Sequence, residues 1–143
     1  MNPRGQVPTL SFNGEIITES AIIAQFLVDK QPSHLVPTTG TPEGALRRAR
    51  IARFVDTFIA VSSNHLFKLP LLKTDAEVEE TAELGVAQIV QTVEPLLADA
   101  KPFFSGSETL TLAEVSFLGI LLLPCPSEMM VPPMLFILTK AIP

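Results

Sequence analysis

The hydrophobic and polar positions near the start of the chain predict a β-hairpin that leads into a helix. The segment Val7–Phe12 is a candidate strand, and its proline stands near the start, where a missing N–H is tolerated. Asn13-Gly14 follows, a pair that favours a tight hairpin turn because both residues tolerate positive φ. Glu15–Ile17 is then the returning strand. A helix is expected from Thr18-Glu-Ser20 to about Asp29, because apolar residues recur there at helical spacing.

A segment rich in proline, glycine, serine and threonine interrupts this pattern between Gln31 and Pro42. Its prolines argue against regular structure, so the segment is a candidate domain boundary. We therefore expect a small αβ unit at residues 1–31, a linker at 32–42 and a helical unit at 43–143.

Helical periodicity dominates after this linker. Helices are expected over residues 43–67, 75–97 and 111–123, and a proline near the end of the second should kink or end it. The third should open with a capping box, in which the Thr111 side chain accepts from the Glu114 N–H and Glu114 reaches back. The predicted fold class is α+β and mostly helical. The residues expected on the apolar faces of the first two helices are Ile51, Phe54, Val55, Phe58, Val61, Val86, Ile89, Val90, Val93 and Leu97.

Composition and charge narrow the classes of function. The 143 residues include 10 basic and 15 acidic side chains, a net charge of −5. Nucleic-acid binding needs a basic face that neutralises phosphates, so nucleic acid is not an expected partner. Hydrophobic residues make up 47% of the chain and charged residues 17%, which excludes intrinsic disorder and allows a sizeable core.

The sequence gives no support for metal, disulfide or membrane chemistry. Cys125 is the single cysteine, which excludes an intramolecular disulfide and a CxxC motif, and a reducing, cytoplasmic compartment is expected. The two histidines, His34 and His65, lack the HExxH spacing, and no metal site is predicted. The apolar stretch 117–138 contains Glu128 and four prolines, which argues against a membrane span.

Several motifs occur in an order that is more specific than any one of them alone. They begin with Asn2-Pro-Arg-Gly-Gln-Val-Pro-Thr-Leu10 and, beyond the hairpin, Ile17-Thr-Glu-Ser-Ala-Ile-Ile23. Leu35-Val-Pro37 and Ser107-Glu-Thr-Leu-Thr-Leu-Ala-Glu114 follow. Together they resemble the cytosolic glutathione transferase family from residue 2 to about residue 118. The resemblance implies a partial thioredoxin-like hairpin and helix, followed by an all-α bundle of the glutathione transferase C-terminal type.

The resemblance also implies glutathione as a cosubstrate. In the family the bond before the proline matching Pro8 is cis, so that the main chain of Val7 can pair with the extended cysteinyl part of the tripeptide. The Gln6 side chain would bond to the γ-glutamyl end. The γ-glutamyl carboxylate would dock at Ser20, at a helix N-terminus, and Glu19 would pair with the ammonium group. The implied activity is conjugation of glutathione to a small electrophile, or glutathione-dependent thiol reduction, in a homodimer.

The chain departs from the family pattern at both ends. In the family, a β-α-β-α unit precedes the stretch matching Asn2 and carries the Tyr, Ser or Cys that activates the thiol, whose free pKa is about 8.5. This chain has no Tyr, and its Ser and Cys residues do not match that position, so no catalytic residue is predicted. The tail from about residue 124 does not resemble the family. A truncated or mis-spliced gene model, a divergent remnant and a non-catalytic interaction module are the alternatives.

Ordinary structural roles compete with some of these assignments. The hydroxyl groups of Thr18 and Ser20 are common helix caps. The four arginines between residues 47 and 53 are expected to form a solvated face with local partners such as Asp56. The residues expected to pack within the helical unit, rather than line a substrate pocket, are His65 and Phe67.

Overall fold

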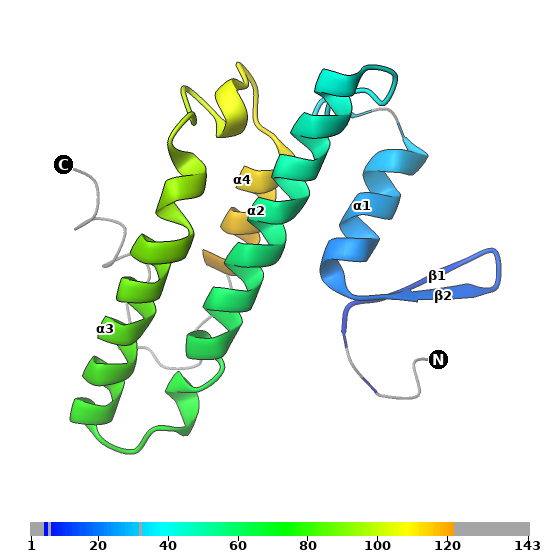
Figure 1. The fold of residues 1–143 in the computed structure, drawn as a ribbon. Helices are drawn as coiled ribbons and strands as arrows, with labels where there is room; N and C mark the ends of the chain where they lie inside the picture. Colours follow the sequence, from blue (N-terminus) through cyan, green and yellow to red (C-terminus); the bar gives the residue numbers. More distant parts are fainter. Residues whose placement is uncertain (1–4, 6, 32, 122–143) are drawn as a thin grey trace.

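The computed structural model describes residues 5, 7–31 and 33–121, and this part of the chain is mostly helical with a two-stranded antiparallel sheet (Figure 1). The α+β, mostly helical class is therefore confirmed. Among the helices described, none is both long and apolar enough to cross a bilayer. Cys125 and the predicted tail from residue 124 lie outside the described residues. The main elements are β1 (Thr9–Phe12), β2 (Glu15–Thr18), α1 (Ser20–Lys30), α2 (Pro42–Leu66), α3 (Asp75–Thr92) and α4 (Leu112–Leu121).

The hairpin of β1 and β2 forms as the sequence predicts. Asn13 and Gly14 both have positive φ, 50° and 86°, which lets the chain reverse within two residues. The strands pair from Thr9 opposite Thr18 to the residues that flank the turn. β1 begins later than predicted, so Val7 precedes the paired part of the strand.

Helix α1 supports the hairpin. The ring of Phe12 lies edge-on to that of Phe26, with 5.1 Å between the ring centroids. The Lys30 ammonium lies 5.3 Å from the centroid of the Phe12 ring. Aromatic and cation–π contacts of these kinds each contribute on the order of 0.5–1 kcal/mol. Because a two-stranded hairpin alone is only marginally stable in water, these contacts are a substantial part of its support.

The segment between α1 and α2 contains neither helix nor strand in its described residues, as predicted, but it is fixed to the helical unit. The Leu35 carbonyl accepts a hydrogen bond of 2.8 Å from the Leu112 N–H, at the start of α4. The Arg48 guanidinium donates to the Pro37 carbonyl at 3.2 Å and also pairs with Asp29 near the end of α1. These contacts hold α1, the connecting segment and α2 together.

Helix α2 lies at the centre of the core, with α1 on one side of it and α3 on the other (Figure 1). Its aromatic side chains carry the packing. Phe54 contacts Phe104 with ring centroids 4.8 Å apart, and Phe58 contacts Phe117 at 5.0 Å. The buried hydrophobic residues are Val36, Ile51, Phe54, Val55, Phe58, Val93, Phe104, Leu112 and Ala113.

The second predicted helix is shorter than expected. Helix α3 ends at Thr92, and a 3₁₀ turn over Glu94–Leu97 follows, so the effect predicted for the proline is confirmed. The prediction of a core position is wrong for two residues of this segment. Leu97 is 41% exposed because the helical phase is lost before it, and Val90 is 45% exposed at the edge of the buried stripe.

The start of α4 contains half of the predicted capping box. The Glu114 carboxylate accepts from the Thr111 N–H at 2.8 Å and from the Thr111 hydroxyl at 2.7 Å. The prediction that the Thr111 hydroxyl oxygen accepts from the Glu114 N–H is wrong. This oxygen accepts instead from the Ala113 N–H, which is an equally common capping partner. Glu114 also accepts from the Phe104 N–H at 2.7 Å, and this bond ties the loop that carries a core aromatic ring to α4.

Glu114→Gln is expected to lower the free energy of unfolding at neutral pH by about 1–3 kcal/mol, because an amide cannot accept all of these bonds. Burial alone would raise the pKa of Glu114, but the hydrogen bonds from Thr111 and the Phe104 N–H outweigh it and lower the pKa. The carboxylate therefore contributes fully to the free energy of unfolding above the ordinary glutamate pKa of about 4.3. This contribution is lost as the pH falls through the lower pKa that Glu114 has in the folded protein.

Urea denaturation at a series of pH values measures this effect. The difference in stability between wild type and Glu114→Gln should shrink as the pH is lowered from about 5 toward about 3. Glu108→Gln, at an exposed position of the same loop, is the control and should change the stability by less than about 0.5 kcal/mol. A difference that stays constant over this pH range would contradict the role given to the carboxylate.

Candidate functional site

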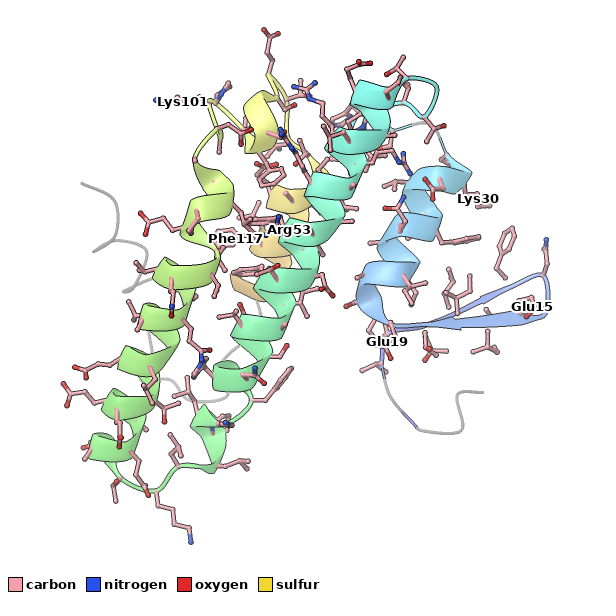
Figure 2. All side chains as sticks on the ribbon, in the orientation of Figure 1. Glu15, Glu19, Lys30, Arg53, Lys101 and Phe117 are labelled. Atoms are coloured by element: carbon pink, nitrogen blue, oxygen red, sulfur yellow. The ribbon has the colours of Figure 1, made fainter. Side chains whose placement is uncertain are left out.

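Three of the four residues predicted to bind glutathione lie at the open end of the hairpin, away from its turn. Because Thr9 pairs with Thr18, the chain enters β1 and leaves β2 at the same end of the sheet. Figure 2 shows Glu19 where β2 meets α1, and Glu15 near the turn at the far end. The predicted residues that the register brings to this end are Val7, Glu19 and Ser20.

The main chain just before β1 is open to a ligand. The Val7–Pro8 bond is cis, as the resemblance implies. Val7 is 89% exposed as a residue, and no described residue forms a hydrogen bond with its main chain. Gln6, the fourth predicted binding residue, lies outside the described residues.

Glu19 has a backbone conformation that residues other than glycine seldom adopt. Its φ is 70° and its ψ is 119°, and such a conformation costs on the order of 1–3 kcal/mol. Glu19 is the N-cap residue of α1, and its carbonyl accepts from the Ile23 N–H at 2.9 Å. Its side chain makes no capping bond, is exposed and forms no ion pair with the described residues. An exposed carboxylate therefore stands beside the start of the helix.

The start of α1 is suited to an anion. Ser20 is the first residue of this 11-residue helix and is exposed, and the first turn contains no acidic side chain. The ordinary interpretation of Thr18 and Ser20 as helix caps is wrong, because Glu19 occupies the N-cap position and provides no side-chain cap. The first N–H groups and the positive end of the helix dipole are thus available to a negatively charged group.

This arrangement has the chemistry to bind the head group of a zwitterionic amino acid and the peptide that follows it. A carboxylate and a helix N-terminus stand next to each other, and the chain that enters β1 lies at the same end of the hairpin. Within the described residues, no group of three or more His, Cys, Asp or Glu side chains is placed to hold a metal ion. Comparison of the chain with protein-family models, curated proteins and solved structures finds no match.

Three of the four arginines of α2, Arg47, Arg50 and Arg53, are exposed, as predicted, but the expected local pairing with Asp56 is wrong. The observed partners of Arg47, Arg48 and Arg50 lie on other elements, far away in the sequence, and spacing along one helix therefore could not identify them. Asp56 itself has no ion pair with the described residues. The observed pairs are Arg47 with the Ser105 carbonyl at 3.0 Å, Arg48 with Asp29, and Arg50 with Asp99 at 3.4 Å.

The packing predicted at the end of α2 is confirmed for one of two residues. The His65 ring lies 2.9 Å from the Gln88 side-chain oxygen, measured from Nε2, and it packs against Gly85 of α3. A Cβ atom at Gly85 would stand 3.2 Å from this ring, so the glycine allows the two helices to approach. Phe67 is 69% exposed, and the prediction that it packs is wrong, because α2 ends one residue before it.

Glu19→Gly is expected to raise the free energy of unfolding by about 1 kcal/mol, because glycine adopts positive φ without steric cost. Urea denaturation measures the change. Glu15→Gly is the matched control: this residue lies in β2 without positive φ, and glycine there should cost about 0.5–1 kcal/mol. Equal destabilisation by both substitutions would show that the backbone at position 19 is not strained.

Proposed function

We propose that the chain binds glutathione at the open end of the hairpin, and that its parent activity is conjugation of glutathione to small electrophiles. One observation carries the proposal: the pairing of Thr9 with Thr18, which brings the chain before β1 next to Glu19 and the start of α1. The order of motifs that resembles the glutathione transferase family is the second support.

The γ-glutamyl end of glutathione carries an ammonium group and a carboxylate on one carbon atom. In the proposed complex, the Glu19 carboxylate pairs with the ammonium group. The N–H groups at the start of α1, together with the Ser20 hydroxyl, bind the carboxylate. A single short segment thus recognises both charges of the zwitterion, and the strained backbone of Glu19 is consistent with such a role.

The cysteinyl part of glutathione is an extended peptide. Its amide groups pair with the Val7 main chain, as a strand added to the edge of a sheet does. We assign no residue of this chain to activation of the thiol. The chain therefore contributes binding and orientation of glutathione, and we expect conjugation to be slow compared with binding.

Titration calorimetry with reduced glutathione tests the proposal. Glu19→Gln should weaken binding by about fivefold, the size expected for an exposed ion pair of about 1 kcal/mol. Ser20→Asp should weaken it by at least about tenfold, because a carboxylate in the first turn repels that of glutathione while it favours the helix. Because Ser20→Asp should be at least as stable as wild type, weaker glutathione binding by this variant cannot be caused by unfolding.

Glu15→Gln is the matched control, since Glu15 lies at the turn end of the same hairpin and its replacement should leave the affinity unchanged. Unchanged binding by both Glu19→Gln and Ser20→Asp would refute the proposed site. Conjugation to chlorodinitrobenzene, followed by absorbance, measures the parent activity. Binding without conjugation would favour a non-catalytic module over an enzyme.

A further inference from the structure

A cleft of about 480 Å³ lies between α1, α2 and α4 and extends to Ala21, the residue after Ser20 in the first turn of α1. Its walls are mostly apolar. Ala24 and Phe26 contribute from α1, Ala52 and Val55 from α2, and Leu112 from α4. The volume lies within the range of about 300–1,000 Å³ that is typical of small-molecule sites, and such sites often occur where two structural units meet.

The polar side chains among the lining residues are Gln25 from α1, Asp56 from α2 and Ser116 from α4, and of these only the Asp56 carboxylate is purely a hydrogen-bond acceptor. The Gln25 side-chain N–H donates to Asp29 at 2.9 Å, and Asp29 in turn pairs with Arg48. This bond orients the Gln25 amide and leaves its oxygen available. Asp56, the second acceptor, forms no ion pair with the described part of the chain.

The charge of the cleft is therefore one-sided. Asp56 is the only charged residue among those that line it, and no arginine or lysine from the described residues is among them. A ligand with a positive group satisfies this carboxylate, whereas an anion would meet its repulsion. Shape and charge together select a small molecule with an apolar body and one cationic end.

We propose that this cleft is a binding site for a small apolar amine, whose protonated nitrogen pairs with Asp56 and whose hydrocarbon part lies against the alanine and valine side chains of α2. Gln25, which is held by its bond to Asp29, offers a further acceptor on the α1 wall of the cleft. The proposal does not rest on glutathione binding, because neither Asp56 nor Gln25 is among the residues assigned to glutathione.

Two naphthalene probes of opposite charge test this inference on the full chain. Naphthylethylamine carries a cation and naphthylacetate an anion on the same apolar ring. The chain contains no Trp and no Tyr, so the fluorescence of naphthalene can be followed with little protein background. We expect the amine to bind about fivefold more tightly than the acetate, as for an ion pair with the exposed Asp56 carboxylate.

Two substitutions distinguish the effect of the charge of the cleft on probe binding from the effect of its shape. Asp56→Asn should reduce the ratio of the two affinities to about one. Ala52→Leu, at an exposed position of α2, should fill the cleft and weaken both probes. Asp75→Asn and Ala60→Leu are the matched controls, since both residues are exposed and lie outside the cleft, and they should change neither affinity.

Equal affinities of the wild type for the two probes would overturn the proposal, as would naphthylethylamine binding that survives Ala52→Leu. Light scattering on the same samples provides a further test. A change of oligomeric state caused by Ala52→Leu, without any effect on the probes, would show that the cleft is a contact between two copies of the chain and would also overturn the proposal.

Discussion

The register of the β1–β2 hairpin is the constraint on which the candidate site depends. Pairing of Thr9 with Thr18 brings the segment before β1 and the start of α1 to one end of a sheet that has two strands in the described part of the chain. A slip of one residue would turn every strand side chain to the opposite face. The two-residue turn at Asn13 and Gly14 prevents such a slip, because its positive φ angles suit one geometry only.

The hairpin and the helical unit depend on each other through α1. A sheet of two strands needs a supporting surface, and the contact of Phe12 with Phe26 provides it. Helix α1 is in turn held by the pair of Asp29 with Arg48 and by packing of Val28 against the core. The hydrogen bond from the Leu112 N–H to the Leu35 carbonyl also joins the segment after α1 to α4. The candidate site therefore rests on elements that are distant in the sequence.

Local chemistry made much of this fold predictable. The hairpin turn and the end of α3 before Pro95 each follow from residues whose backbone preferences act within a few positions. Contacts between distant elements were not predictable in the same way. The pairing of Arg48 with Asp29 and the cleft beside Asp56 arise only once the helices have packed.

The candidate site shows the same division. The order of the motifs predicted the residues of the candidate site, and the Asn13-Gly14 turn predicted the hairpin that brings them to one end. No sequence pattern indicates that Glu19 adopts positive φ. A glycine or asparagine at that position would have suggested it, because these residues tolerate the left-handed region. Glutamate does not, and the strain at the site is therefore visible only in the structure.

Amide chemical shifts of the nitrogen-15-labelled chain during titration with reduced glutathione test the central claim most directly. The account predicts saturable shifts at Val7, Ser20 and Ala21, which surround the open end of the hairpin, and little change at Asn13 and Gly14 in its turn. Shifts confined to the turn or to the helices beyond α1, or no saturable shift at all, would contradict the claim that the hairpin register builds a glutathione site.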